Sequence, residues 1–291
     1  MTLSILYRGC RHVIRCTRDL LSPRAITWRY MKRRYPNKAV ITKLGRDLKV
    51  RIYTHDVIGK DIYVNRMFEK AECKFVMKFL KPGMVFFDAG ANLGQYTLLA
   101  ARRVGPAGQV HSFEPSSRMF AELKYNVELN GLATMCRLNR VALSNNEGIA
   151  RLSMYEPGAE VYGSIGRHRR EEGKISVIGY EEVKTIRLDD YYVKESAINH
   201  IDLIKIDIEG AELLALQGAV QMLSNGAAPA IVIELADINT VGFGYQATEI
   251  WDYLEKLGYR MYHFDKHGRI SGLAQRPADF SRAQNVVGMK G

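Results

Sequence analysis

The sequence predicts an α/β protein whose mostly parallel sheet has helices on both faces. Two observations favour this class. From residue 84 onward, short apolar runs that fit strands alternate with segments of helical periodicity. Four of these runs also end at or beside a carboxylate, and the four are Asp88, Glu114, Asp207 and Glu234. Ligands bind at the carboxyl ends of parallel strands, so the pattern predicts a ligand site there.

The segment before the sheet is expected to form a hairpin and a helix. Residues 39–53 alternate apolar and polar side chains around Gly45-Arg46-Asp47, which is typical of a hairpin. Residues 69–80 have a helical pattern that stops at Pro82-Gly83. We therefore expect three parts: an arm over 1–38, the hairpin and helix over 39–82, and a main domain over 83–291.

Within the main domain the elements follow in order. Strands are expected over 84–88, 110–114, 137–143, 203–207 and 230–235. Helices are expected over 94–104, 115–130, 210–223 and 248–257, and residues 259–264 and 285–289 are predicted to add a terminal antiparallel pair. The irregular stretch from Tyr155 to Tyr180 is expected to be a rim loop that carries specificity. It contains His168, which is a candidate base, although a lone histidine in a basic loop is more often a solvated side chain.

The positive charge is concentrated at the N-terminus. Residues 1–51 hold 14 Lys and Arg with only two acids, which leaves 28 of 42 basic and 29 of 31 acidic residues for the rest. A body close to neutral disfavours a nucleic-acid partner, because such binders carry their charge on the folded domain. The four cysteines are too scattered for a metal or disulfide framework, so no metal is expected.

The arm itself has an amphipathic pattern. Over residues 3–21, Arg8, Arg11, Arg15 and Arg18 fall opposite an apolar stripe, and a basic run with interleaved aromatics follows at 29–35. Three interpretations stay open: a helix docked on its own domain, a helix on an anionic membrane surface through residues 3–35, or a targeting or nucleic-acid segment. No transmembrane or secretory segment is predicted, so we expect a cytoplasmic protein, peripheral at the inner face of a membrane if the arm binds lipid.

The turn after the first strand of the main domain carries the sharpest signal. Asp88 is followed by Gly90, Asn92 and Gly94, a spacing that permits close backbone approach but is not the dinucleotide fingerprint. A carboxylate here suits a cationic ligand better than a pyrophosphate. Glu114, at the end of the next strand, can accept hydrogen bonds from both ribose hydroxyls. S-adenosylmethionine has an ammonium group and a ribose diol; another nucleoside is the alternative.

Four sequence blocks together resemble the FkbM family of S-adenosylmethionine-dependent methyltransferases. They are Lys81-Pro82-Gly83 leading into residues 88–94, Phe113-Glu114-Pro115, Val141-Ala142-Leu143-Ser144, and Ile204-Lys205-Ile206-Asp207-Ile208-Glu209-Gly210-Ala211-Glu212. The likeness extends over about residues 63–289. It implies a class I methyltransferase, Rossmann-like, with a seven-stranded sheet whose last pair is antiparallel. It also implies O-methylation, often of a hydroxyl on a sugar, glycolipid or secondary metabolite.

The resemblance also implies site residues. The cofactor pocket would be lined by Asp88, Gly90, Asn92, Gly94 and Glu114, with the Val141–Ser144 turn, which contains Ala142, beside the adenine. From its place at the end of the strand expected over 203–207, Asp207 is predicted to face the transferring methyl group. Methyl transfer needs an aligned acceptor and removal of its proton, for which Asp207, Glu209 or Glu234 is the candidate base. The alternatives are a structural hydrogen bond for Asp207, and favourable helix N-terminal charge for Glu209 and Glu212.

Other functions stay open at this point. A methyltransferase acting on RNA ribose or protein would also fit the basic arm, and a non-catalytic adaptor for a membrane or glycan is a different class. The intact set of carboxylates and glycines speaks against the adaptor. The acceptor, the position methylated and the oligomeric state are not determined by the sequence.

Overall fold

The computed structural model describes residues 22–155, 163–165, 177–195 and 198–291. The expected helix over 3–21 and the candidate base His168 lie outside the described residues. The chain divides into two compact units, between Phe68 and Glu69. The helix expected over 69–80 thus belongs to the second unit, where it packs on the helix over 95–104 and on the strand over 259–264.

The first unit is a hairpin with two helices. Its elements are α2 (Pro23–Arg34), β1 (Ala39–Leu44), β2 (Leu48–Tyr53) and α3 (Val57–Asn65). The predicted hairpin is confirmed by antiparallel pairing of β1 with β2. Helix α2 lies within the basic helical arm expected over 1–38, and it starts with Ser22 as N-cap, whose side chain accepts a hydrogen bond from the Ala25 N–H. It buries Trp28, whose ring lies 5.3 Å from that of Tyr63 in α3.

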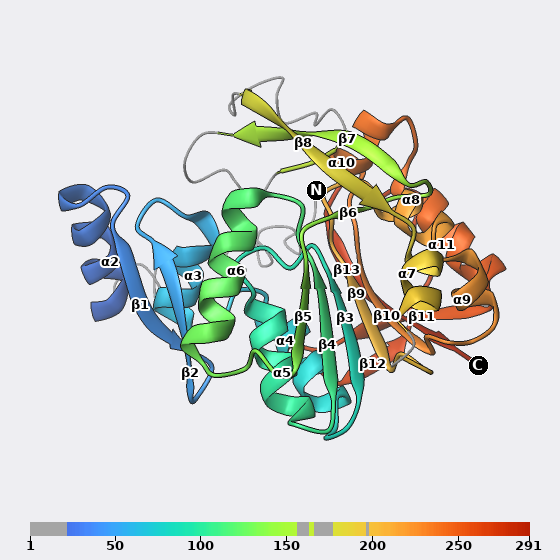
Figure 1. Ribbon diagram of the computed structural model, residues 1–291, viewed down its shortest axis with the longest axis horizontal. Helices are drawn as coiled ribbons and strands as arrows, with labels where there is room; N and C mark the ends of the chain where they lie inside the picture. Colours follow the sequence, from blue (N-terminus) through green and yellow to red (C-terminus); the bar gives the residue numbers. More distant parts are fainter. Residues whose placement is uncertain (1–21, 156–162, 166–176, 196–197) are drawn as a thin grey trace, which may run out of the picture. The chain divides into compact units, whose positions relative to one another are not determined.

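The second unit contains the predicted parallel sheet (Figure 1). Its strand order is β12-β11-β13-β10-β9-β3-β4-β5, and β5, β4, β3, β9 and β10 are parallel neighbours. The bounds are β3 (Val85–Ala89), β4 (Gln109–Phe113), β5 (Cys136–Asn139), β9 (Leu203–Ile206), β10 (Ala230–Leu235), β11 (Tyr259–Phe264), β12 (Ile270–Leu273) and β13 (Gln284–Lys290). The last pair is antiparallel as predicted, with β13 between β10 and β11.

One strand exceeds the seven that the resemblance implied. Strand β12 adds an eighth at the edge beside β11, and all four of its residues are exposed. In the central strands β3 and β9, by contrast, every residue is buried. Burial of consecutive residues is what a sheet covered on both faces requires.

Helices cover both faces of the sheet. In Figure 1, α4 (Lys70–Phe79), α5 (Gln95–Val104) and α6 (Ser117–Leu129) lie on one side, and α7 (Leu188–Lys194), α8 (Glu212–Gln217), α9 (Val220–Ser224) and α11 (Ala247–Lys256) on the other. A short helix, α10 (Asp237–Thr240), follows β10 and continues into a 3₁₀ turn, Val241–Phe243. The α8 and α11 side contains the large core around Trp251.

The single strand predicted over 137–143 is wrong. The chain leaves the main sheet after Asn139, and β6 (Ala142–Leu143) pairs instead with β8 (Val177–Ile186). Together with β7 (Gly148–Tyr155) they form a second sheet in the order β6-β8-β7. Asn139 and Arg140 interrupt the apolar pattern before it resumes at Val141, and two polar residues do not by themselves indicate a change of sheet.

The single helix predicted over 210–223 is also wrong. It is broken at Gly218, where a Cβ would lie 2.0 Å from the backbone oxygen of Ser144. The buried carboxylate of Asp189 accepts the N–H groups of Gln221 and Met222 at 3.1 and 2.9 Å, and so satisfies the start of α9. The helix breaks because a distant part of the chain needs this close approach.

We expect Asp189→Ala to destabilise the second unit by about 1–3 kcal/mol, because it leaves buried N–H groups without acceptors. The neighbouring Asp190→Ala is the control, since the side chain of Asp190 is 41% exposed. The measurement is urea unfolding of both variants and the wild type. Equal midpoints for the two variants would contradict the capping role.

Candidate active site

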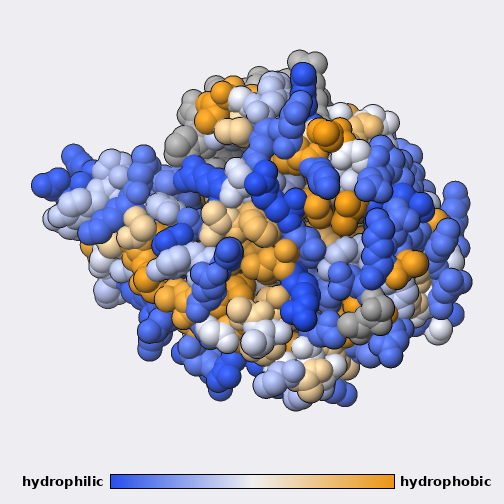
Figure 2. Space-filling view, viewed as in Figure 1, coloured by the Kyte–Doolittle hydropathy of each residue, from blue (hydrophilic) through white to orange (hydrophobic). Residues whose placement is uncertain are grey.

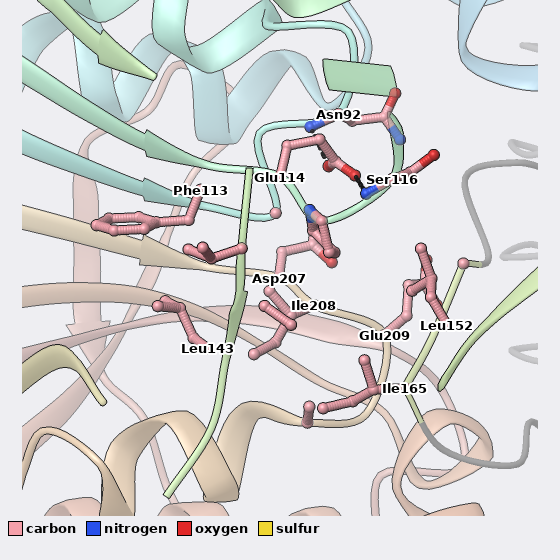
Figure 3. A pocket seen from close by; sticks show the side chains of 16 residues that line it. Asn92, Phe113, Glu114, Ser116, Leu143, Leu152, Ile165, Asp207, Ile208 and Glu209 are labelled. Carbon is pink, nitrogen blue, oxygen red and sulfur yellow. Dashed lines mark hydrogen bonds between the residues drawn. The ribbon is translucent and has the colours of Figure 1, made fainter. Parts of the chain in front are cut away.

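A hollow of about 600 Å³, including its opening to solvent, lies at the carboxyl ends of β3, β4 and β9 (Figure 3). This is the edge of the sheet where the sequence placed the site. The described residues that line it are Gly90, Asn92, Phe113, Glu114, Pro115, Ser116, Val141, Ala142, Leu143, Leu152, Gly163, Ile165, Asp207, Ile208, Glu209 and Ala211.

The turn after β3 forms one wall. Gly90 has φ of 80°, and a Cβ there would lie 1.9 Å from the backbone oxygen of Asp207. Asn92 also has a left-handed backbone, with φ of 51°, and it lines the hollow. Gly94 does not line it; this glycine is the N-cap of α5, and a Cβ there would lie 2.7 Å from Leu123 Cδ1. Gly94 therefore serves the packing of the turn.

Asp88 lies behind this wall and does not line the hollow. Its side chain is fully buried, and Oδ2 accepts a 2.6 Å hydrogen bond from the Thr97 hydroxyl. Its other oxygen, Oδ1, has no hydrogen-bond partner among the described residues. Burial raises the pKa of Asp88, while the ammonium of Lys205 opposes that shift. A direct contact of Asp88 with a ligand stays a prediction.

Glu114 lies at the end of β4 with its carboxylate in the lining (Figure 3). Oε2 accepts the Asn92 N–H at 2.8 Å, and Oε1 accepts the Ser116 N–H at 2.9 Å. Burial raises the pKa of Glu114 to about 7, against the lowering effect of these two bonds. Each oxygen keeps a lone pair for a ligand hydroxyl.

The opposite wall is apolar. Figure 3 shows Leu143, Ile208, Leu152 and Ile165 around the side of the hollow away from Asn92. Ala142 lies in this wall, next to Leu143, where the sequence expected it. Leu152 on β7 and Ile165 were not predicted from the sequence. The strands of the second sheet are separated along the chain, so no continuous pattern in the sequence indicates that this sheet forms.

Two of the three candidate bases line the hollow. Asp207 contributes a carboxylate whose Oδ2 accepts a 2.8 Å charged hydrogen bond from Lys205 Nζ. Glu209 has a left-handed backbone with φ of 53°, and its carbonyl oxygen accepts a 2.7 Å bond from the Ser164 hydroxyl. Such strain in a non-glycine residue is typical of functional sites.

Glu234, the third candidate, does not line the hollow. Its Oε2 accepts a hydrogen bond from Asn239 Nδ2 at 3.0 Å. Burial raises the pKa of Glu234 to about 10, and the negative charge of Asp207 adds to the shift. A carboxyl group that keeps its proton at neutral pH cannot receive another, so the geometry favours Asp207 and Glu209 as bases.

Glu212 supports the loop from below. Its buried Oε1 accepts the N–H groups of Ile208 and Gly210 at 2.9 and 3.2 Å. The interpretation of Glu212 as a structural carboxylate at a helix start fits these bonds.

A polar network that was not predicted from the sequence lies next to Asp207. The Tyr96 hydroxyl donates to Glu69 Oε2 at 2.8 Å, and Lys205 Nζ lies 4.6 Å from the centre of the Tyr96 ring. Burial, followed by the charge of Asp207, raises the pKa of Glu69 to about 7. The one signal in the sequence was a lysine within an otherwise apolar strand.

Comparison with known proteins assigns the family. A family model described as the methyltransferase FkbM domain matches residues 88–261, which is more than half of the chain. The chain belongs to this family. The match begins at Asp88 and includes Glu114, Asp207 and Glu234, so the predicted resemblance is confirmed.

Two relatives are about 30% identical to this chain over the aligned segments. The 31-O-demethyl-FK506 methyltransferase FkbM of Streptomyces tacrolimicus is 32% identical over 48% of this chain and 60% of its own length. The 2-O-methyltransferase NoeI of Sinorhizobium fredii is 30% identical over 53% and 65%. The matched part of this chain thus spans less than two thirds of both relatives. A solved S-adenosylmethionine-dependent O-methyltransferase of Thermotoga maritima covers 90% of this chain and 80% of its own, with 14% identity and a TM-score of 0.42.

We expect Gly90→Ala to destabilise the protein by about 3 kcal/mol or more, because the added Cβ would overlap the Asp207 carbonyl. Gly131→Ala is the matched control: its φ is also positive, at 66°, but its Cβ would enter open space. We expect about 1 kcal/mol there, from backbone strain alone. Chemical unfolding measures both, and equal losses would contradict the close-approach role of Gly90.

Proposed function

We propose that this chain is an S-adenosylmethionine-dependent O-methyltransferase that acts on a hydroxyl of a sugar, glycolipid or secondary metabolite. The observation that carries the proposal is one hollow lined by both Glu114 and Asp207, in a chain of the FkbM family. The two relatives described above are named for O-methylation, which supports the same reaction type.

The residues present fit this cofactor. Glu114 keeps acceptor positions for a ribose diol, and the wall around Ala142 and Leu143 suits an adenine ring. Gly90 and Asn92 would border the methionine part, where the absence of a side chain at Gly90 allows close approach. Asp88 would act on a cationic ligand through its field rather than by contact, because it is fully buried.

The bound cofactor supplies a methyl group on a sulfonium, which is already activated for displacement. The work left to the chain is to align the acceptor oxygen and remove its proton. Asp207 is the proposed base, since its carboxylate is in the lining and is held by Lys205. Glu209 is the alternative base from the same loop.

One assay distinguishes the proposed function from two alternatives. Methylation of RNA ribose or protein would use the same cofactor site, whereas an adaptor would bind the cofactor without transfer. Labelled S-adenosylmethionine offered with separate pools of glycans, metabolites, RNA and protein tests all three. Label in the RNA or protein pool alone, or cofactor binding without any transfer, would refute the proposed acceptor class.

We expect Glu114→Gln to weaken S-adenosylmethionine binding by about 1–3 kcal/mol, because charged hydrogen bonds to the ribose are lost. Wild-type affinity should rise with pH through about 7, since ionised Glu114 is the better acceptor. The Gln variant should lack this pH dependence. Calorimetric titration between about pH 6 and pH 8 measures both effects. Glu128→Gln, at an exposed position on α6, is the control.

The base is tested by Asp207→Asn, which keeps the size and removes the charge. We expect turnover to fall about 100-fold or more with cofactor affinity little changed. Asp279→Asn, at an exposed site, should leave both unchanged. Collapse of cofactor binding with normal turnover at saturation would show that Asp207 holds the cofactor instead.

We further propose that the arm over residues 3–35 attaches the enzyme to an anionic membrane surface, on the cytoplasmic side. In its described part, α2 has five basic residues and no acid, and exposes Ile26 and Tyr30. Figure 2 shows mostly hydrophilic side chains over α2. Among the described residues, no helix is long and apolar enough to cross a bilayer. Attachment would therefore rest on charge and partial insertion.

We expect Arg33→Glu/Arg34→Glu to lower co-sedimentation with phosphatidylserine vesicles, because each basic residue near such a surface contributes about 1 kcal/mol. Salt should weaken wild-type binding in the same way. The control is Lys256→Glu/Lys266→Glu, an equal charge change at exposed sites of the second unit. Vesicle binding that is unchanged in the arm variant would rule out the electrostatic role of α2.

A further inference from the structure

Lys205 is a buried cation in the centre of the main sheet. It lies on β9 between Asp88 on β3 and Val232 on β10, and only 2% of it is exposed. It does not line the hollow. A buried ammonium is costly unless other groups compensate its charge, so its partners indicate what it does.

The ammonium is compensated on three sides. It donates to Asp207 Oδ2 at 2.8 Å and lies over the ring of Tyr96 at 4.6 Å. The charges of Asp88 and Glu69 attract it as well, and together these groups raise the pKa of Lys205 despite its burial. Lys205 therefore stays charged over the working pH range.

The two carboxylate oxygens of Asp207 differ in their hydrogen-bond partners. Oδ2 is bound by Lys205, whereas Oδ1 has no hydrogen-bond partner among the described residues. The side chain of Asp207 is 22% exposed, and it lines the hollow that Lys205 does not reach. Lys205 thus reaches the site only through Asp207.

The groups that surround Asp207 are mostly acidic. The acidic or polar groups that face the cluster come from α4, α5, β3, β10, β13 and the loop after β9, and they are Glu69, Glu72, Tyr96, Asp88, Glu234, Asn285, Glu209 and Glu212. Among the described residues that interact within this cluster, Lys205 is the one cation. Removing it would leave the Asp207 carboxylate among other carboxylates with no cation in contact.

We propose that Lys205 is a positioning residue that keeps Asp207 ionised and orients it, so that its second oxygen is available to the acceptor hydroxyl. This inference rests on the proposed function, because it takes Asp207 as the group that receives the proton. It predicts that Lys205 sets the pH range of the reaction without touching the substrate.

The test uses the full-length protein with aspartate labelled with ¹³C at the side-chain carboxyl. NMR titration follows Asp207, whose signal is assigned from its loss in Asp207→Asn. We expect Lys205→Met to raise the titration midpoint of Asp207 by about 1 pH unit or more, and Lys205→Arg to leave it near the wild-type value. The control is Lys290→Met, because Lys290 also lies over a tyrosine ring, that of Tyr259, 5.4 Å away.

Kinetics provide the second readout. The acidic limb of the kcat profile should move to higher pH in Lys205→Met, by the same amount as the NMR midpoint. In the Asp207→Asn background, Lys205→Met should cost no further activity, because its effect passes through Asp207. If Lys205→Met does not fold, Lys205→Gln replaces it, since the amide keeps a donor and removes the charge.

Two results would overturn the inference. One is an unchanged Asp207 midpoint in a folded, uncharged Lys205 variant; the other is a full additional loss of turnover in the Asp207→Asn background. Failure of the proposed function gives a different pattern. In that case the wild type transfers no methyl group to any pool, while the NMR midpoints still report on Lys205.

Discussion

The close contact between Gly90 and the backbone of Asp207 is the constraint on which the site depends. Only hydrogen fits where a Cβ would lie 1.9 Å from the Asp207 oxygen. The contact brings the end of β3 against the end of β9, and the turn then continues to Asn92, whose N–H bonds to Glu114 on β4. Three strand ends are thereby held around one hollow by a backbone contact at Gly90 and by the hydrogen bond from the Asn92 N–H to the Glu114 carboxylate.

Charge compensation is the second condition, and it acts inside the sheet. Lys205 and Asp88 are neighbours across β9 and β3, and Asp207 is two residues further along the same strand direction. Burial favours the neutral forms of Glu69, Glu114 and Glu234, and raises the pKa of each. Asp207 has a different contact, because the ammonium of Lys205 lies 2.8 Å from its Oδ2. The carboxyl groups around the ends of these strands thus have different surroundings.

The second sheet completes the hollow on its apolar side. Strand β7 supplies Leu152, and Ser164, next to Ile165, donates a hydrogen bond to the Glu209 carbonyl. This bond ties the rim to the loop that bears Glu209, one of the two candidate bases that line the hollow.

The sequence by itself determined the α/β class, the parallel core strands, the glycine turn and three strand-end residues of the site, Glu114, Asp207 and Gly90. These signals are local, because a buried strand and a tight turn each restrict the residues within them. Only the tertiary structure decided that Asp88 is buried behind the wall, that Glu234 lies outside the lining of the hollow, and that Gly218 divides the helix after β9. It also joined Lys205, Tyr96 and Glu69 into one network. Each of these features depends on burial or on a contact between segments far apart in the chain. The local sequence pattern predicts neither the burial nor the contact.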